Sequence, residues 1–285
     1  MLSCLAKTKS FLSFFLFLLS ISLVAYGNEQ PMPDHFKWGR ILKRYVAEGL
    51  VDYQHLLESK AELNSYLMEL GTVPIETLSE MSREDRIAFW INLFNASVIK
   101  LVLDEYPIER FGQIPAAFEI RTARAAGEFF SLSEIRDQIL RQGFKDERVL
   151  FALVSGRLDS PKLLAEAFSG EKLEQQLDQV ARDFVEDETY NKIKPGEKKV
   201  YLSPLFRDFG KDFLLNFGSV DSSSSFSEIE TAIISFLLHH LRSPEKRLFL
   251  DSGRYKIVYL AEDPRLNDTQ DNVRKEIAAG GRHLE

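Results

Sequence analysis

The chain has 285 residues, of which 45% are hydrophobic, 28% charged and 12% aromatic, with a single cysteine. This is the composition of an ordinary globular protein, and it excludes collagen, coiled-coil rods and low-complexity tails. The formal net charge of -7 at pH 7 argues against broad affinity for nucleic acid or anionic lipid, so we expect no nucleic-acid partner.

The first 27 residues have the pattern of a signal peptide. Lys7 and Lys9 form a positive segment, residues 11–24 form an apolar run, and residues 25–27 supply the small residues of a cleavage site. The run is shorter than the roughly 20 residues of a bilayer-spanning helix, which favours cleavage after Gly27 over an uncleaved anchor. We therefore expect an exported protein, periplasmic or secreted, that contacts the membrane only through this segment before cleavage.

The single cysteine, Cys4, lies within the predicted signal peptide, so the mature chain contains no thiol. Disulfides, thiolate metal sites and cysteine nucleophiles are thereby excluded from the mature protein. Because Cys4 precedes the apolar run, the segment also lacks the arrangement of a lipoprotein signal. No metal-binding or nucleotide-binding motif stands out along the chain, so we expect neither a metal nor a cofactor.

The remaining chain is predicted to have an α+β fold, a predominantly helical single domain with a small antiparallel sheet. This domain spans residues 28–267, with a core at about 36–217, a C-terminal part at 226–267 after a serine-rich linker, and a tail at 268–285. Apolar periodicity, capping residues and turn residues predict the individual elements. In chain order, the helices are 36–48, 56–70, 82–105, 133–141, 161–168, 172–186 and 227–241, and the strands are 118–124, 128–131, 199–203 and 255–260.

The helix at 82–105 is predicted to be the enclosed centre of the fold. A capping box opens it at Ser82, Pro107 stops it, and apolar residues surround its axis. Asn92 and Asn95 are three residues apart and share one face, so their buried amides need hydrogen-bond partners. We favour bracing of neighbouring backbone as their role, and contact with a ligand is the alternative.

Several motifs resemble the domain of unknown function 547 family in order and spacing. The most specific is Ala88-Phe89-Trp90-Ile91-Asn92-Leu93-Phe94-Asn95-Ala96, and residues 132–135, 139–141 and 151–153 match further along. With the landmarks at 51–53 and 202–206, the resemblance covers roughly residues 36–267. The family is defined by sequence and has no settled activity, so the resemblance implies a fold rather than a function.

Usual members of that family look as if they hold a cysteine and histidine site, the arrangement that papain-like acyl transfer needs. This chain departs from that pattern at every position. The two histidine positions are Asp137 and Leu150, and the two cysteine positions are Ser155 and Ser160. A serine hydroxyl needs a positioned base, and none of the five histidines matches a family site by spacing. We therefore predict a pseudoenzyme, in which the fold persists without thiol chemistry.

The loop at 155–161 is the best candidate for a binding pocket. Gly156 permits close backbone approach, Arg157 is suited to clamp a carboxylate or phosphate, and Ser160 is placed to cap the helix predicted after it. The alternative is a capped surface loop with an ion pair between Arg157 and Asp159.

Two further candidate binding residues, Asp263 and Asn267, lie near the end of the domain. Residues 263–267 resemble the Asp-Trp-x-Leu-Asn close of the family, with Pro264 in place of the aromatic residue. If that aromatic residue normally lines a pocket, the pocket is changed in this chain.

Three functions remain open at this stage. The first is an exported, non-catalytic module that binds a protein or a small-molecule ligand through the loop at 155–161. The second is a hydrolase or acyl transferase of papain-like ancestry that uses Ser155 or Ser160 with Asp137 and an unconventional base. The third is a purely structural envelope protein. A concave site holding these side chains together would favour the first two, and a filled apolar centre would favour the third.

Overall fold

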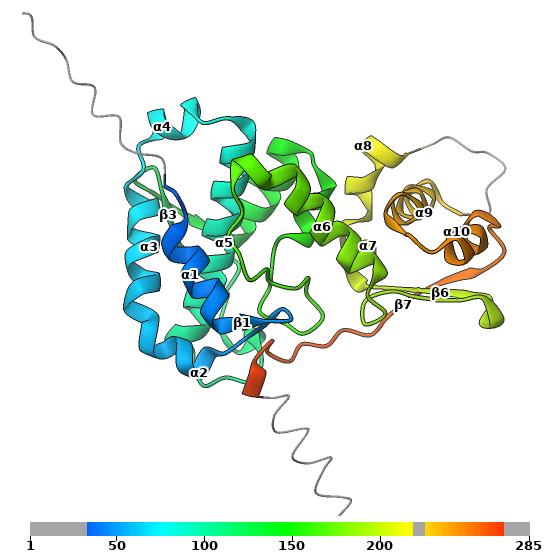
Figure 1. Ribbon diagram of the computed structural model, residues 1–285, viewed down its shortest axis with the longest axis horizontal. Coiled ribbons are helices and arrows are strands. Elements are labelled where there is room, and N and C mark those ends of the chain that lie inside the picture. Colours follow the sequence, from blue (N-terminus) through cyan, green and yellow to red (C-terminus); the bar gives the residue numbers. More distant parts are fainter. Residues whose placement is uncertain (1–32, 219–225, 271–285) are drawn as a thin grey trace, which may run out of the picture. The chain divides into compact units, whose positions relative to one another are not determined.

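The computed structural model describes residues 33–218 and 226–270. The predicted signal peptide, the serine patch of the linker and most of the predicted tail lie outside the described residues. Helices make up most of the described chain (Figure 1). The α-helices are α1 (Phe36–Tyr45), α2 (Tyr53–Leu56), α3 (Lys60–Thr72), α4 (Ile75–Glu80), α5 (Arg83–Glu105), α6 (Leu173–Glu186), α7 (Pro204–Phe209), α8 (Leu214–Phe217), α9 (Glu228–His240) and α10 (Pro244–Asp251).

Short strands and tighter or wider helical turns complete the fold. The strands are β1 (Val46–Ala47), β2 (Leu50–Val51), β3 (Arg121–Ala125), β4 (Glu128–Ser131), β5 (Lys192–Lys194), β6 (Lys199–Leu202) and β7 (Lys256–Tyr259). A π-helix, η3, spans Glu134–Phe144, and a 3-10 helix, η4, spans Glu147–Phe151. The predicted fold class, a predominantly helical α+β domain, is confirmed.

The strands form three small sheets. The β1–β2 and β3–β4 pairs are antiparallel hairpins, and the predicted turn at Ala126 and Gly127 joins the second. In the third sheet, β5 pairs antiparallel with β6, whereas β6 pairs parallel with β7. A parallel neighbour needs a long crossover, and α9 and α10 supply it.

Helix α5 occupies the centre of the fold, as its sequence predicts. Ser82 caps it, with its Oγ accepting a hydrogen bond from Asp85 N at 3.0 Å. Among the described helices, α5 is long and apolar enough to cross a membrane by length and composition, but 83% of that stretch is buried inside the protein. Burial on all sides is the property of a core helix, so the apolar length of α5 is explained by packing.

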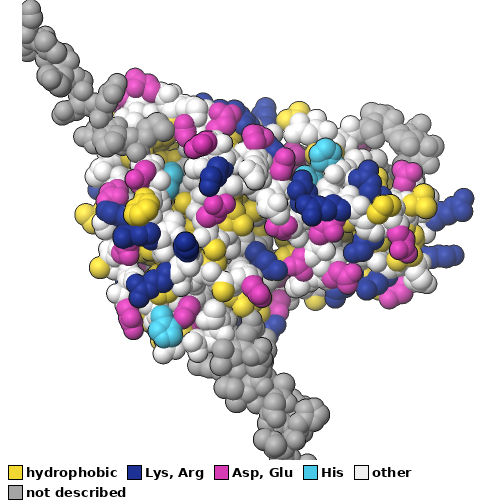
Figure 2. Space-filling model, viewed as in Figure 1, with side chains coloured by type: hydrophobic (Ala, Val, Ile, Leu, Met, Phe, Trp, Pro, Cys, Tyr) yellow, Lys and Arg dark blue, Asp and Glu magenta, His cyan; other side chains and the backbone are white. Residues whose placement is uncertain are grey.

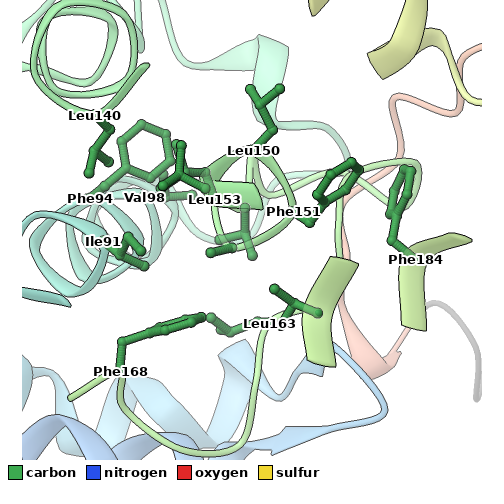
Figure 3. Close-up of a cluster of buried hydrophobic side chains, with 14 of the residues drawn as sticks. Ile91, Phe94, Val98, Leu140, Leu150, Phe151, Leu153, Leu163, Phe168 and Phe184 are labelled. Atoms are coloured by element: carbon green, nitrogen blue, oxygen red, sulfur yellow. The ribbon is translucent and has the colours of Figure 1, made fainter. Parts of the chain in front are cut away.

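Figure 3 shows how side chains from distant segments meet around α5. Ile91, Phe94 and Val98 of α5 point toward residues of η3 and of the segment after it. Phe151 and Phe184 face each other, with ring centroids 4.9 Å apart. The core is thus assembled from contacts far apart in the sequence.

The predicted helix at 161–168 is wrong. These residues, which we call the strap, have no regular secondary structure. Asn92 of α5 binds both backbone groups of Phe168: Nδ2 donates to the carbonyl at 2.8 Å, and Oδ1 accepts from the N–H at 3.0 Å. Gln176 of α6 likewise donates to the carbonyl of Ala167 at 2.9 Å. Side chains of two helices therefore satisfy backbone groups that a local helix would have paired internally.

The C-terminal part, predicted to follow a linker, packs on the same core as residues 36–217. Phe236 of α9 is fully buried, and its ring lies 5.2 Å from that of Phe151 and 4.8 Å from that of Phe213. The pairing of β6 with β7 adds backbone hydrogen bonds across the same junction. The hydrophobic cluster is continuous between the two parts.

A buried histidine at the start of α1 makes stability depend on pH. His35 is 8% exposed, and its Nδ1 lies 2.7 Å from the hydroxyl of Tyr66. Burial lowers the pKa of His35 from 6.5 to about 4, although the charges of Asp34 and Asp85 act in the opposite direction. Because the unfolded chain then takes up the proton first, the contribution of His35 to stability is lost as pH falls from about 6.5 to about 4.

We expect His35 to lower the free energy of unfolding by about 2 kcal/mol between pH 7 and pH 5, since one pKa unit corresponds to about 1.4 kcal/mol. The variant His35→Gln should lack this component. Urea denaturation of the wild-type protein and the variant at both pH values measures the difference. An equal loss of stability in the two proteins would contradict the assignment.

Candidate functional site

A cavity of about 240 Å³, which we call the first cavity, adjoins the loop that the sequence singled out. It is somewhat smaller than the roughly 300–1,000 Å³ of sites for drug-sized ligands, so its size suits a small molecule. Its apolar lining is Phe94, Phe118, Leu150, Leu153, Val154, Pro161, Pro204, Leu205 and Phe209. Its polar and charged lining is Arg136, Ser155, Arg157, Asp159, Ser160, Ser203, Asp208 and Glu262.

Four predicted site residues, Ser155, Arg157, Asp159 and Ser160, line this cavity together. Ser155 is half-buried, and its Oγ forms no hydrogen bond with any described residue. Ser155 therefore keeps a free hydroxyl group in the lining of the cavity.

Arg157 is held by carboxylates of the protein itself. Its Nε and Nη2 donate to Asp159 at 2.8 and 2.6 Å, and Nη2 also donates to Glu262 at 2.9 Å. These hydrogen bonds raise the pKa of Arg157, and the largest contribution comes from those that Asp159 accepts. The alternative interpretation from the sequence, an ion pair between Arg157 and Asp159, is confirmed. This pair neutralises the guanidinium group that we considered as a binding site for an anionic ligand.

Ser160 and Gly156 stabilise the conformation of the loop through contacts within the protein. Ser160 Oγ donates to the carbonyl of Arg157 at 2.8 Å, so it braces a turn, and there is no helix after it to cap. Gly156 has φ of +69°, and a Cβ at this position would lie 2.8 Å from Phe111 Cδ2. The close approach predicted for Gly156 is therefore to Phe111, and Gly156 does not line the cavity.

Asn92 and Asn95 do not line the first cavity. Asn95 Nδ2 donates to the carbonyl of Ala152 at 2.9 Å, and Oδ1 accepts from Val154 N at 3.0 Å. Asn92 binds the strap in the same two-bond manner. Both amides are buried and brace backbone, which confirms the favoured interpretation and corrects their inclusion among the ligand-binding candidates.

Asp263 and Asn267 hold the C-terminal segment against the loop and do not line the cavity. The N–H of Asp263 donates to Asp159 at 2.7 Å, while its carboxylate accepts from Arg265 Nε at 2.7 Å. Asn267 accepts from the hydroxyl of Tyr53 at 2.8 Å, and its N–H donates to the carbonyl of Gly156 at 3.1 Å. Their role is to fasten the C-terminal segment to the loop at 155–161.

Asp137, the proposed partner of a serine nucleophile, does not line the cavity either. Arg136 Nε and Nη2 each donate to its carboxylate at 2.8 Å, and Arg141 Nη1 donates at 2.6 Å. Burial by itself would raise the pKa of Asp137, but these hydrogen bonds outweigh burial and lower it. A carboxylate held ionised by two guanidinium groups is a weak base for a serine hydroxyl.

Arg136, which no sequence pattern indicated, also lines the cavity with a donor that is not engaged. Its guanidinium lies over the rings of Phe118 and Phe209, at 5.0 and 5.3 Å from their centroids. Two of its nitrogens bind Asp137, and Nη1 donates to no described residue. The neighbouring position, Asp137, drew attention through the family resemblance, but nothing in the local pattern distinguishes Arg136 from a surface arginine.

The α7 wall of the cavity was also missed. Ser203 caps α7, and Pro204, Leu205 and Phe209 face the cavity from it. The signal was present, because residues 202–206 stood out as a landmark, but no sequence pattern linked them to the loop at 155–161. Within residues 33–218 and 226–270, no group of three or more His, Cys, Asp or Glu side chains is placed to hold a metal ion.

Comparison with protein families supports the resemblance. The family model described as "Protein of unknown function, DUF547" matches residues 78–185 of this chain. The matched segment contains α5, η3, the loop at 155–161 and the strap, so the chain resembles this family across the centre of its fold. The comparisons with curated proteins and with solved structures gave no match. The family has no assigned function, and the cavity is the feature of the structure that bears on function.

Proposed function

We propose that the mature protein is an exported, non-catalytic module that binds a small, largely apolar ligand in the first cavity. The observation that carries this proposal is the cavity itself, which combines apolar lining residues with polar groups that are not engaged, among them Ser155 Oγ and Arg136 Nη1. A few polar groups set in an apolar lining are the usual composition of a ligand site. The N-terminal pattern of residues 1–27 supports export.

The polar groups of the cavity indicate where a ligand would be held. Arg157 is already neutralised by Asp159 and Glu262. Arg136 is paired with one carboxylate, that of Asp137, and its Nη1 is not engaged. We therefore infer that the polar end of the ligand contacts Arg136 and Ser155, while its apolar part lies on Phe94 and Phe118. These contacts would hold the ligand without changing it chemically.

The surroundings of Ser155 support binding rather than catalysis. A serine nucleophile needs a base within hydrogen-bonding distance of its hydroxyl. Asp137 is engaged by two arginines away from the cavity lining, and no histidine of the described residues is among the lining side chains. The third function, a structural protein without a pocket, is not favoured because the cavity is present.

Ser155→Phe is expected to weaken binding in the first cavity by at least about tenfold, because the ring would occupy part of the cavity and would displace the ligand. The probes are benzyl alcohol, benzoate and benzylamine, which share a ring and differ in charge. Saturation-transfer NMR detects binding to the purified mature protein, and titration gives the affinity. Ser155→Ala is the graded comparison, since it removes the hydroxyl without filling the cavity and should weaken binding less than Ser155→Phe does. A folded Ser155→Phe protein that binds every probe as the wild type does would contradict the proposal.

The same serine variants separate binding from catalysis. We expect a fluorophosphonate probe to leave the wild-type protein unlabelled, because no base activates Ser155. Labelling of the wild type that disappears in Ser155→Ala would overturn the non-catalytic assignment and favour the hydrolase.

A further inference from the structure

A second cavity of about 290 Å³ shares only Pro161 with the first. Three segments enclose it: the β1–β2 turn, the strap, and α6 with the residues that follow it. Its lining residues are Val46, Glu48, Gly49, Phe151, Pro161, Lys162, Leu163, Leu164, Ala165, Val180, Asp183, Phe184, Asp187 and Tyr190. In Figure 2, hydrophobic side chains lie near the middle of the visible face, with acidic and basic side chains around them. In the same view, Figure 1 shows that this region lies between β1 and α6.

The most deeply buried residues of the second cavity's lining are apolar, and we call them its floor. Phe151, Val180 and Phe184 are 1%, 5% and 3% exposed. The ring of Phe184 stacks on Tyr190 with centroids 4.5 Å apart, and the hydroxyl of Tyr190 donates to the carbonyl of Ser160 at 2.9 Å. Fixed aromatic rings of this kind present a preformed surface to a ligand.

The β1–β2 turn forms the wall opposite α6 and is in close contact with the strap. Gly49 has φ of +85°, and a Cβ at this position would lie 2.5 Å from Lys162 Cγ. The turn therefore requires glycine both for its backbone conformation and for its contact with the strap. The same turn carries Glu48 into the lining.

The charges of the lining are unbalanced. Lys162 is its single basic residue, and it is paired with Asp187 at 2.7 Å. Asp183 accepts a hydrogen bond from the neutral amide of Gln179 at 2.6 Å, and Glu48 forms no ion pair with any described residue. Two carboxylates at the rim of an apolar cavity thus have no cation opposite them. An apolar ligand with one positive charge would complement both the floor and the rim.

We propose that the second cavity binds a small apolar amine, with its ring or alkyl part on Phe151 and Phe184 and its ammonium group between Glu48 and Asp183. This site is separate from the first cavity and does not depend on the function proposed there. The charge of the lining distinguishes the two cavities, because the arginines of the first are paired with carboxylates, whereas two carboxylates of the second are not paired with cations.

The charge requirement is tested with benzylamine, benzyl alcohol and benzoate on the purified mature protein, using calorimetry and NMR. We expect benzylamine to bind more tightly than the other two, and we expect Glu48→Gln with Asp183→Asn to weaken benzylamine about five- to tenfold, since each exposed charge contributes little alone. Glu171→Gln, which removes an exposed carboxylate outside both linings, is the matched control and should change nothing.

The location of the amine is tested by filling each cavity in turn. Ala165 is exposed and lines the second cavity, so Ala165→Phe should abolish benzylamine binding, whereas Ser155→Phe should leave it intact. Binding lost only in Ser155→Phe would place the amine in the first cavity and overturn the inference. Absence of benzylamine binding, or equal affinity for benzyl alcohol, would also overturn the inference. The function proposed for the first cavity is judged separately, since it is supported by any probe whose binding Ser155→Phe blocks.

Discussion

Asn95→Ala should lower the free energy of unfolding by about 3 kcal/mol, because it leaves two buried backbone groups without partners. In the wild type, the amide of Asn95 satisfies the carbonyl of Ala152 and the N–H of Val154, and Asn95 is only 1% exposed. For a domain of this size, such a loss corresponds to a decrease in melting temperature of roughly 6–12 °C.

Ser97 provides the matched control on the same helix. It is 3% exposed, and its Oγ is buried without a hydrogen bond to any described residue. Ser97→Ala removes a polar atom that contributes no bond, so stability should change by less than about 0.5 kcal/mol or should increase. Thermal and urea denaturation of the two variants give the comparison. Similar losses in both would mean that the bracing bonds of Asn95 are not what stabilises the segment at 152–154.

The parts of the fold that were predicted from the sequence are those whose signals are local. Helix α5 carries its own cap at Ser82 and an apolar pattern on all sides, and the β3–β4 hairpin carries its turn at Gly127. The strap was predicted wrongly because its conformation depends on Asn92, which lies 76 residues before Phe168. Local propensity favoured a helix after Pro161, and long-range hydrogen bonds decided otherwise.

The candidate site likewise has one part that local sequence indicated and other parts that only the fold brings together. The loop at 155–161 is a contiguous segment, so its composition alone indicated a pocket, and Ser155 does face the cavity. The other walls come from η3, α7 and the C-terminal segment, and only the fold brings Arg136, Phe209 and Glu262 to that loop. The resemblance pointed to Asp137, one residue away from the arginine that lines the cavity. Successive side chains of the π-helix η3 point in different directions around its axis, and this difference is enough to exclude Asp137 from the lining.

Phe236→Ala should destabilise the whole described domain by about 4 kcal/mol, the usual cost of a large cavity in a core. Phe236 is fully buried, and its ring lies within 4.8 to 5.3 Å of those of Phe151, Phe213 and Phe217. Because Phe151 belongs to the segment before the serine-rich linker, a loss of packing in α9 is transmitted to the helices of the first part.

The two tryptophans allow this coupling to be measured directly. Trp38 and Trp90 both lie in the part before the linker, far along the chain from α9. Their fluorescence during urea denaturation therefore reports unfolding of that part, and Phe236→Ala should shift its midpoint to lower urea. Leu248→Ala, at a position 74% exposed on α10, is the control and should leave the midpoint in place. If Phe236→Ala left the tryptophan-detected midpoint unchanged, residues 226–267 would fold as a separate unit, and the α7 wall of the first cavity would have to be stable without α9.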